Sequence, residues 1–381
     1  MDFSQRYSYS FPTNIRFGAG VIDELPAHLK NKKIRKPLVV TDGTVKELPF
    51  FKSIIVDLDK SGIQGVVFSE MQKNPVKTDV LNGGDVYHEN KCDAIIGLGG
   101  GAPLDVARAI ALRVNHTRDL FDYDDLLDGW KLVTNEVPYF VTIPTNAGTG
   151  SEVGRSTVIS EDESHKKRVL FAPQLLASQV FADPLLTMDL PPFFTAATGM
   201  DALSHNVEAF LAKGFHPMAD GIALEAISLI AESIEKATFS PDTESRSKML
   251  IASLMGAVAF QKGLGIIHSL AHPLSTIVDA HHGTAISLMF GHGLEFNTPG
   301  NEAKMKRLAE ALKIADPETS VSAHIMHLTQ KLNLPQKISE IGVKSDHIAP
   351  LAQLASEDFC LPCNPNPATK EDFISIYQKA L

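Results

Sequence analysis

The strongest constraint on the fold is a pattern that recurs in the first half of the chain: short β-branched runs, each ending in a polar or glycine turn. The runs are PLVVTDG (37–43), IQGVVFSE (63–70), CDAIIGLGGG (92–101) and PYFVTIPTN (138–146), with helical patterns such as APLDVARAIALRVN between some of them. Strands that alternate with helices predict an α/β fold with a parallel sheet covered on both faces. The turns at Asp42, Gly99–Gly101 and Thr145–Gly150 follow the strands, where such sheets bind ligands.

The pattern changes after residue 185 to apolar residues spaced three and four apart, which is typical of helices. The segment DPLLTMDLPPFFT supplies a proline-rich break before ADGIALEAISLIAESIEKATF, SRSKMLIASLMGAVAF, EAKMKRLAEALKIA and AHIMHLTQKLN. A chain of 381 residues is long for one hydrophobic core. We therefore expect an α/β dinucleotide-binding domain at 1–185 and an all-helical, metal-binding domain at 186–381, with a cleft between them.

Composition argues against several functional classes. A net charge of −10 without a basic stripe disfavours nucleic-acid binding, and no apolar run approaches the ~20 residues of a membrane span. The start, MDFSQRYSYSFPTN, has no basic region followed by an apolar one, so we expect no secretory signal. Only Cys92, Cys360 and Cys363 occur, which favours a reducing cytoplasm and free thiols over disulfides. A redox or zinc role for the lone C-x-x-C at 360–363 is the weaker interpretation.

Four residues of the second half suit a divalent transition metal: Asp201, His205, His268 and His282. Asp201 and His205 are four residues apart, as are His268 and His272, so each pair lies on one face of a helix. Three neutral imidazoles and one carboxylate leave room for a substrate oxygen. A single histidine is more often a packed or surface residue, but five of the 14 histidines lie between residues 268 and 292.

A glycine turn in the first half predicts a dinucleotide site. Gly99, Gly100 and Gly101 follow an apolar run and lead into a helical pattern, whose N-terminus would face a pyrophosphate. The turn does not match G-x-G-x-x-G, and glycines also serve tight turns and packing.

Two further features strengthen the dinucleotide prediction. In PTNAGTGSEV (144–153), Thr145, Asn146 and Thr149 offer hydroxyl and amide groups beside glycines. Asp42 would accept hydrogen bonds from an adenosine ribose and repel a 2′-phosphate, which favours NAD over NADP. Asp-Gly is also a common turn pair, so a turn role for Asp42 stays open.

Together these segments resemble the iron-containing, or group III, alcohol dehydrogenase family. The matching stretches cover essentially the whole chain: IRFGAG, GGGAPLD, PTNAGTGSEV, LPPFFTAATGMDALSHNVEAF, AFQKGLGIIHSLAHPL and HHG. The resemblance implies a dehydroquinate-synthase-like fold, an N-terminal nucleotide domain, a helical metal domain, and a homodimer or larger assembly.

The resemblance also implies roles for individual residues. The four metal ligands would bind iron(II), with zinc as the alternative, and His272 would lie near the nicotinamide and substrate as a proton-relay residue. The matched cofactor positions are Asp42, Asn74, Gly100, Gly101, Asp105, Thr145, Thr149 and Lys167.

The expected activity is that of an NAD(P)-dependent alcohol dehydrogenase. Hydride would pass between NAD(H) and a small alcohol or aldehyde, or a hydroxy acid and its semialdehyde, while the metal polarises the substrate oxygen. Ile286 stands where the family commonly has Asn, Asn146 where it has Thr, and NPNP where it has Asn-Pro-Arg. None of these is a predicted metal ligand, but Ile286 leaves the substrate open.

Three alternatives remain open at this point. The first is a zinc enzyme of the same superfold, resembling glycerol dehydrogenase or dehydroquinate synthase. The second is a metal-dependent hydrolase, and the third is a metal or nucleotide binder without catalytic activity.

Overall fold

The computed structural model describes residues 14–381, so nearly all of the segment in which we expect no secretory signal lies outside the described residues. The described chain divides into two compact units, residues 14–146 with 150–189, and residues 147–149 with 190–381. The boundary expected between residues 185 and 186 falls in the 3₁₀ turn Pro184–Thr187, just before this division. The assignment of cofactor and metal binding to separate domains remains a prediction.

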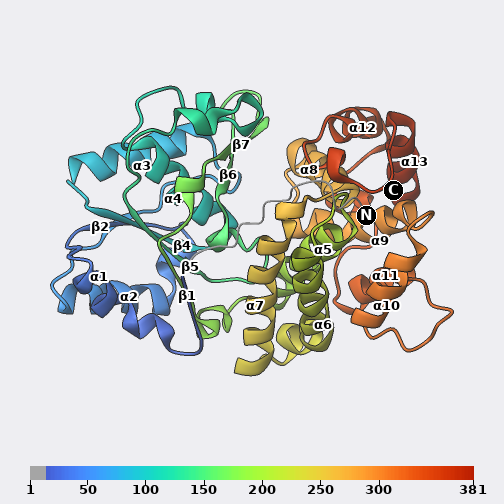
Figure 1. The fold of residues 1–381 in the computed structure, drawn as a ribbon, viewed down its shortest axis with the longest axis horizontal. Helices are drawn as coiled ribbons and strands as arrows, with labels where there is room; N and C mark the ends of the chain where they lie inside the picture. Colours follow the sequence, from blue (N-terminus) through green and yellow to red (C-terminus); the bar gives the residue numbers. More distant parts are fainter. Residues whose placement is uncertain (1–13) are drawn as a thin grey trace. The chain divides into compact units, whose positions relative to one another are not determined.

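The first unit contains a six-stranded parallel sheet in the order β1-β8-β5-β4-β2-β3. Helices α1 (Leu25–Asn31) and α2 (Pro49–Lys60) lie on one face of the sheet, and α3 (Lys77–Glu89) and α4 (Gly101–Arg113) lie on the other (Figure 1). The four strands predicted from the sequence are all present. The strands are β1 (Ile15–Phe17), β2 (Pro37–Val40), β3 (Val66–Phe68), β4 (Ala94–Gly99), β5 (Tyr139–Pro144) and β8 (Gln179–Ala182).

The centre of the sheet brings three of the predicted turns together. Strands β2 and β4 are buried along their whole length because helices cover both faces. β4 pairs with both β2 and β5, so the turns after these strands lie side by side at the carboxyl edge. The chain runs from β2 outward to β3 and then crosses to β4 on the other side of β2. The order therefore reverses between β2 and β4, where open α/β sheets bind ligands.

An antiparallel ribbon that we did not predict comes after β5 in the chain. It consists of β6 (Ser156–Ser160) and β7 (Lys167–Phe171). Arg108 of α4, which is completely buried, donates hydrogen bonds to the carbonyls of Ser156 (3.0 Å) and Leu175 (3.2 Å) and to the Ser151 hydroxyl (2.8 Å). One helix residue thus anchors the ribbon and its flanking loops.

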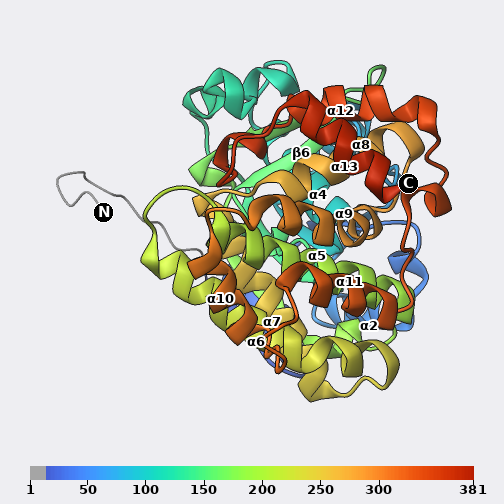
Figure 2. The same cartoon turned by 90° about the vertical axis from the view of Figure 1, so that its right-hand side faces the viewer.

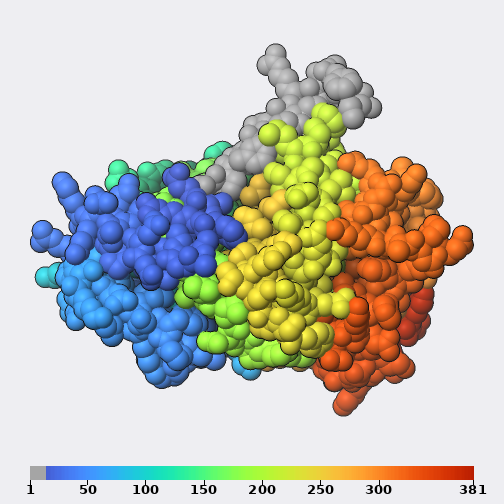
Figure 3. Space-filling view, turned by 90° about the horizontal axis from the view of Figure 1, so that it is seen from below, coloured from blue at the N-terminus to red at the C-terminus, as the bar shows by residue number. Residues whose placement is uncertain are grey.

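The second unit is helical, and α5 is its centre. Residues Thr195–Leu211 of α5 are all buried, because α5 packs against α6, α7 and α9 (Figure 2). On the face shown in Figure 3, the orange surface near α10 lies against the yellow surface of α6 and α7, in agreement with the packing of α10 on α6. The helices are α5 (Pro192–Leu211), α6 (Pro217–Phe239), α7 (Thr243–Ala259), α8 (Ile266–Val278), α9 (His282–Asn297), α10 (Glu302–Ala311), α11 (Val321–Lys331), α12 (Ile348–Ser356) and α13 (Lys370–Ala380).

Within residues 14–381, no single helix has both the length and the apolar composition needed to cross a membrane. One pair of segments, Thr243–Lys262 and Ile266–Val278, meets those criteria jointly, but a bend of 107° separates its two parts.

Glu152 is a buried carboxyl group just after the PTNAGTG loop. Glu152 is only 2% exposed, and its Oε1 atom has no hydrogen-bond partner among the described residues. Burial raises the pKa of Glu152 to about 7, although the charge of Arg108 acts in the opposite direction. The folded state therefore holds a proton that an ordinary glutamate would release at lower pH.

This raised pKa predicts a stability that falls as pH rises from the ordinary value of 4.5 to about 7. In that window the unfolded chain has released the proton while the folded chain still binds it. We expect Glu152→Gln to increase the free energy of unfolding above pH 7 by up to about 3 kcal/mol, and to change it little near pH ~4. Urea denaturation across this range measures the difference. Glu163→Gln, at an exposed glutamate, is the control. If the free energy of unfolding changed with pH in the same way in both variants, the raised pKa of Glu152 would be contradicted.

Candidate metal centre and cofactor site

The structure brings the four predicted metal ligands to one place in the helical unit. Asp201 and His205 lie one turn apart on α5, His268 lies on α8, and His282 is the first residue of α9. Asp201 Oδ1 is 3.4 Å from His282 Nε2, and 3.8 Å from both His205 Nδ1 and His268 Nε2. Asp201, His205 and His268 have ligand atoms that all lie within 4.8 Å of one another. His282 joins this trio through its approach to Asp201.

The charges at the site match what metal binding requires. Burial raises the pKa of Asp201, but His205, His282 and His268 outweigh it and hold the pKa well below its ordinary value. Burial lowers the pKa of His205 to about 4. At neutral pH the carboxyl group is therefore ionised and His205 is neutral, which are the protonation states of metal ligands.

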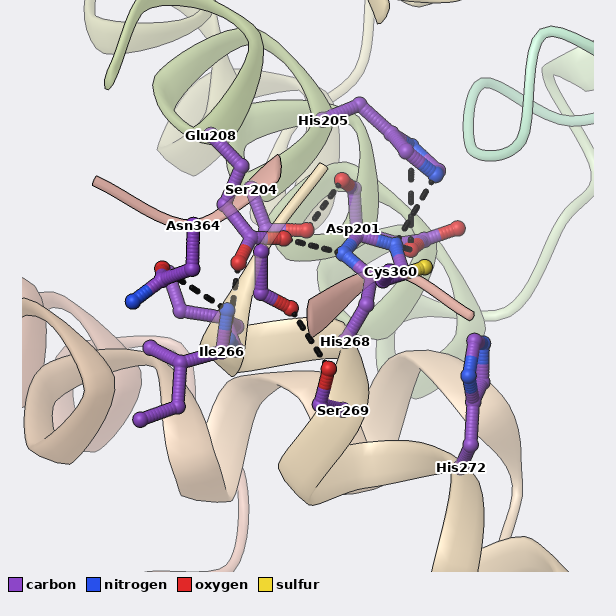
Figure 4. A network of polar contacts seen from close by, with 12 residues as sticks. Asp201, Ser204, His205, Glu208, Ile266, His268, Ser269, His272, Cys360 and Asn364 are labelled. Atoms are coloured by element: carbon purple, nitrogen blue, oxygen red, sulfur yellow. Dashed lines mark hydrogen bonds and ion pairs between the residues drawn. The ribbon is translucent and has the colours of Figure 1, made fainter. Parts of the chain in front are cut away.

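Glu208 orients His268, and the sequence did not identify it. Glu208 lies three residues after His205 on α5, and its Oε2 is in hydrogen-bond contact with His268 Nδ1 (Figure 4). Its Oε1 accepts a hydrogen bond from the backbone N–H of Ile267 at 2.7 Å. Burial raises the pKa of Glu208 to about 8, while the Ile267 N–H and the charge of His205 act in the opposite direction. Metal binding through Nε2 requires the proton of His268 on Nδ1, with an ionised Glu208 accepting it. In that state the lone pair of His268 Nε2 is directed toward His205 Nε2, 3.0 Å away, and toward Asp201.

Gly283 explains how His282 reaches α5. A Cβ atom at position 283 would lie 2.4 Å from the Ala197 carbonyl oxygen and 2.7 Å from its carbon, so a side chain there would push α9 away from α5. The glycine that follows the paired histidines therefore sets the close approach of the two helices. The His282 side chain is 29% exposed, whereas those of the other three ligands are at most 7% exposed, so the site opens on the His282 side.

Aromatic rings flank the open part of the site. The His272 ring lies one turn beyond His268 on α8 and stacks on His282 with 5.5 Å between the ring centres. Phe359 stacks on His272 at 5.2 Å, and Phe260 lies 5.2 Å from His205. These contacts give the histidines a partly apolar surrounding.

The residues present fit a divalent transition-metal ion. Asp201 Oδ1 is buried and has no hydrogen-bond partner among the described residues, although three imidazole nitrogens lie near it. A cation bound between the carboxylate and the imidazoles would satisfy all of these groups together. Three nitrogen donors and one oxygen donor are a set that both iron(II) and zinc accept.

In the α/β unit, the glycine turn lets two loops approach each other closely. Gly99 has φ +149°, and a Cβ there would lie 2.8 Å from Pro103 Cγ; a Cβ on Gly100 would lie 2.6 Å from Asn146 Nδ2. The Thr145 N–H donates to the Gly99 carbonyl at 3.0 Å. Helix α4 begins directly after the carboxyl end of β4, and no side chain caps it, so its first N–H groups are available at this edge of the sheet for an anion.

Asp42 has the turn role that remained open from the sequence. Its Oδ1 accepts hydrogen bonds from the N–H groups of Thr44 (2.8 Å) and Val45 (2.9 Å). A carboxylate has four acceptor positions, so this turn is compatible with a second role toward a ribose, which remains a prediction.

Asp105 is part of the internal framework of the α/β unit. It accepts hydrogen bonds from the Ser151 hydroxyl (2.6 Å) and the Val158 N–H (3.0 Å), and it forms an ion pair with Arg108. Burial raises the pKa of Asp105, while Arg108, these hydrogen bonds and the charge of Lys167 act in the opposite direction. A direct cofactor contact by Asp105 or Lys167 remains a prediction.

Two predicted cofactor residues remain, Asn74 and Thr149. Asn74 is half-buried in the turn before α3, within the α/β unit. Thr149 belongs by its contacts to the helical unit. Their roles also remain predictions.

Comparison with known proteins agrees with this architecture. Residues 12–184 match the family described as "Iron-containing alcohol dehydrogenase", and residues 195–381 match the "Fe-containing alcohol dehydrogenase family, C-terminal". The chain is 34% identical to 4-hydroxybutyrate dehydrogenase of Cupriavidus necator (97% of this chain, 98% of that protein). It is 32% identical to NAD-dependent methanol dehydrogenase of Bacillus methanolicus (98% and 100%). A crystal structure of 1,3-propanediol oxidoreductase superposes with a TM-score of 0.92 at 30% identity (99% and 100%).

The contact between Glu208 and His268 predicts that Glu208→Gln weakens metal binding. The amide can accept from Ile267 only by turning its NH₂ group toward His268 Nδ1, which favours a proton on Nε2 and blocks the ligand atom. We expect the dissociation constant for Zn²⁺ to rise about 10–100-fold or more, as for other residues that orient metal-bound histidines. Titration against a chromophoric chelator measures it, with the exposed Glu225→Gln as the control. An unchanged constant would remove Glu208 from the site.

Proposed function

The chain belongs to the iron-containing alcohol dehydrogenase family, and on this basis we propose that it transfers hydride between NAD(H) and short primary alcohols or their aldehydes. The observation that carries the proposal is the buried group of Asp201, His205 and His268 with His282 beside it. The names of its relatives, which include an NAD-dependent methanol dehydrogenase and a 4-hydroxybutyrate dehydrogenase, support small hydroxyl-bearing substrates. A hydrolase would leave the dinucleotide features of the α/β unit without a role.

We propose iron(II) as the resident metal, with zinc as the alternative. When bound, the ion lowers the pKa of the substrate hydroxyl and stabilises negative charge on its oxygen. Asp201, His205, His268 and His282 would hold it. With neutral imidazoles, these ligands carry only the single negative charge of Asp201, so a divalent ion would keep a net charge of about +1 at the site.

The protein supplies binding, orientation and proton transfer around this centre. The N-terminus of α4 and the turns beside it would bind the pyrophosphate of NAD(H), and Asp42 would bind its adenosine ribose. His272 would accept the proton of the alcohol and pass it to solvent. Phe260 and Phe359 would exclude water from the histidines they contact.

We also propose that the protein acts in a reducing cytoplasm as a homodimer or larger homo-oligomer. The cysteines support the first part, because all three are free thiols and two of them, Cys92 and Cys360, are buried. Sedimentation analysis of the purified protein tests the proposed oligomeric state.

The activity is tested with anaerobic, iron-loaded protein by following absorbance at 340 nm with a panel of short alcohols and NAD, and of aldehydes and NADH. We expect turnover with at least one unbranched primary alcohol or its aldehyde. His205→Gln should lower kcat by at least about 100-fold, because it removes a ligand of the ion that polarises the substrate. His292→Gln, a histidine of α9 outside the group, should retain activity. Metal-loaded protein that is inactive with every alcohol and aldehyde would contradict the proposal.

The charge of Asp42 predicts a preference for NAD that a single substitution relaxes. Asp42→Asn keeps an oxygen that can accept from Thr44 and Val45, but it removes the repulsion of a 2′-phosphate. We expect the ratio of kcat/KM for NADP to that for NAD to rise about 10-fold, equivalent to ~1.4 kcal/mol. Asp59→Asn, at an exposed site on α2, is the control. A ratio that stays constant would mean that Asp42 serves only the turn.

A further inference from the structure

A short segment near the C-terminus, Asp358-Phe359-Cys360, packs against the open part of the metal centre and contacts His272. From its geometry we infer that Asp358 is a positioning residue, which holds the His272 ring in one orientation and one tautomer so that Nε2 accepts the substrate proton. This inference rests on the proposed function, in which His272 relays that proton.

Asp358 is placed by three hydrogen bonds. Its Oδ2 is 2.8 Å from His272 Nδ1, and its Oδ1 accepts from the Ser269 hydroxyl (3.1 Å) and the Cys360 N–H (2.9 Å). The Asp358 side chain is only 8% exposed, and Ser269 and His272 lie three residues apart on one face of α8. The carboxylate therefore joins the C-terminal segment to the helix that also carries His268.

The surroundings of Asp358 favour its ionised form. The Cys360 N–H can only donate, so Oδ1 must accept, and Oδ2 is left for His272. Burial raises the pKa of Asp358, but His272 and these hydrogen bonds lower it below its ordinary value. An ionised Asp358 fixes the proton of neutral His272 on Nδ1, which leaves the lone pair on Nε2.

The ring of His272 also has two stacking partners. It stacks on Phe359 with an interplanar angle of 26° and on His282 with an angle of 19°. The segment that supplies the hydrogen bond thus also supplies one of the stacking partners. His272 has little freedom to turn its ring and exchange its two nitrogens.

The same atoms could be taken for a second metal site, because His272, Asp358 and Cys360 have ligand atoms within 4.8 Å of one another. The hydrogen bonds argue against it, since both oxygens of Asp358 already accept from protein donors. Burial and the nearby charge of Asp358 raise the pKa of the Cys360 thiol well above its ordinary value, so no thiolate is available.

Asp358→Asn tests the inference. The amide oxygen is required by the Cys360 N–H, so the NH₂ group turns toward His272 Nδ1 and makes that nitrogen the acceptor. The proton of His272 then moves to Nε2, where it blocks proton acceptance. We expect kcat to fall by at least about 100-fold, because a wrong tautomer in a comparable acid–histidine pair costs ~10⁴ in turnover. The metal content should be unchanged, and KM should change by less than about 3-fold. Wild-type kcat in this variant would overturn the inference.

A second measurement reads the tautomer without any activity. Nitrogen NMR of zinc-loaded protein with ¹⁵N-labelled histidine distinguishes protonated from unprotonated ring nitrogens, and His272→Gln identifies the His272 signals. The wild-type protein should carry the proton on Nδ1, and Asp358→Asn should carry it on Nε2. A wild-type His272 with its proton on Nε2 would overturn the inference, even if the variant failed to fold.

Two controls separate positioning from general damage. Glu357→Gln makes the same acid-to-amide change at the adjacent, exposed residue and should retain wild-type kcat. In the His272→Ala background, Asp358→Asn should cause no further loss, because its effect acts through His272; an additional large loss would overturn the inference. If the wild-type enzyme is inactive with every alcohol and aldehyde of the panel, the proposed function fails, and the tautomer measurement still decides the role of Asp358.

Discussion

The site depends on the burial of one carboxylate, Asp201, in the middle of helix α5. An isolated ionised carboxylate in a protein interior is strongly unfavourable, by several kcal/mol even after relaxation. Here the groups around it are the imidazoles of His205, His268 and His282, which come from three helices, and a cation held by these four side chains would compensate the charge. Because α5 packs on α6, α7 and α9, the hydrophobic core that stabilises the helical unit also fixes where these imidazoles converge. Core and site are therefore built by the same helix.

A common device orients the two histidines of α8. His268 and His272 each use Nδ1 to contact a carboxyl group, Glu208 in the first case and Asp358 in the second. Each carboxylate also accepts a backbone N–H, from Ile267 or from Cys360, so its own position is fixed. In both cases Nε2 becomes the working atom. It is directed toward Asp201 in His268, while in His272 we assign it to the substrate proton.

The sequence predicted those parts of the structure that depend on local patterns. Strands β2 to β5 are short apolar runs because both faces of the sheet are covered, and Asp201 and His205 have the spacing of one helical turn. What it missed depends on contacts between distant residues. β1 has only three residues, two of its side chains are partly exposed, and its register with β8 joins Ile15 to Val180. Glu208 and Asp358 likewise gain their roles from histidines 60 and 86 residues away.

The departures from the family pattern can now be placed in the structure. Ile286 lies one turn after His282 on α9 and is completely buried in the helical core, so its side chain does not border any open space. The Asn146 side chain lies so close to Gly100 that a Cβ at position 100 would come within 2.6 Å of its Nδ2. By contrast, Phe359 is 40% exposed and stacks on His272, and Phe260 is partly exposed and contacts His205. The groups exposed beside the histidines are therefore aromatic rings, one on a segment that contacts α8 and one in the turn after α7, whereas the departure at Ile286 is enclosed by the core of the helical unit.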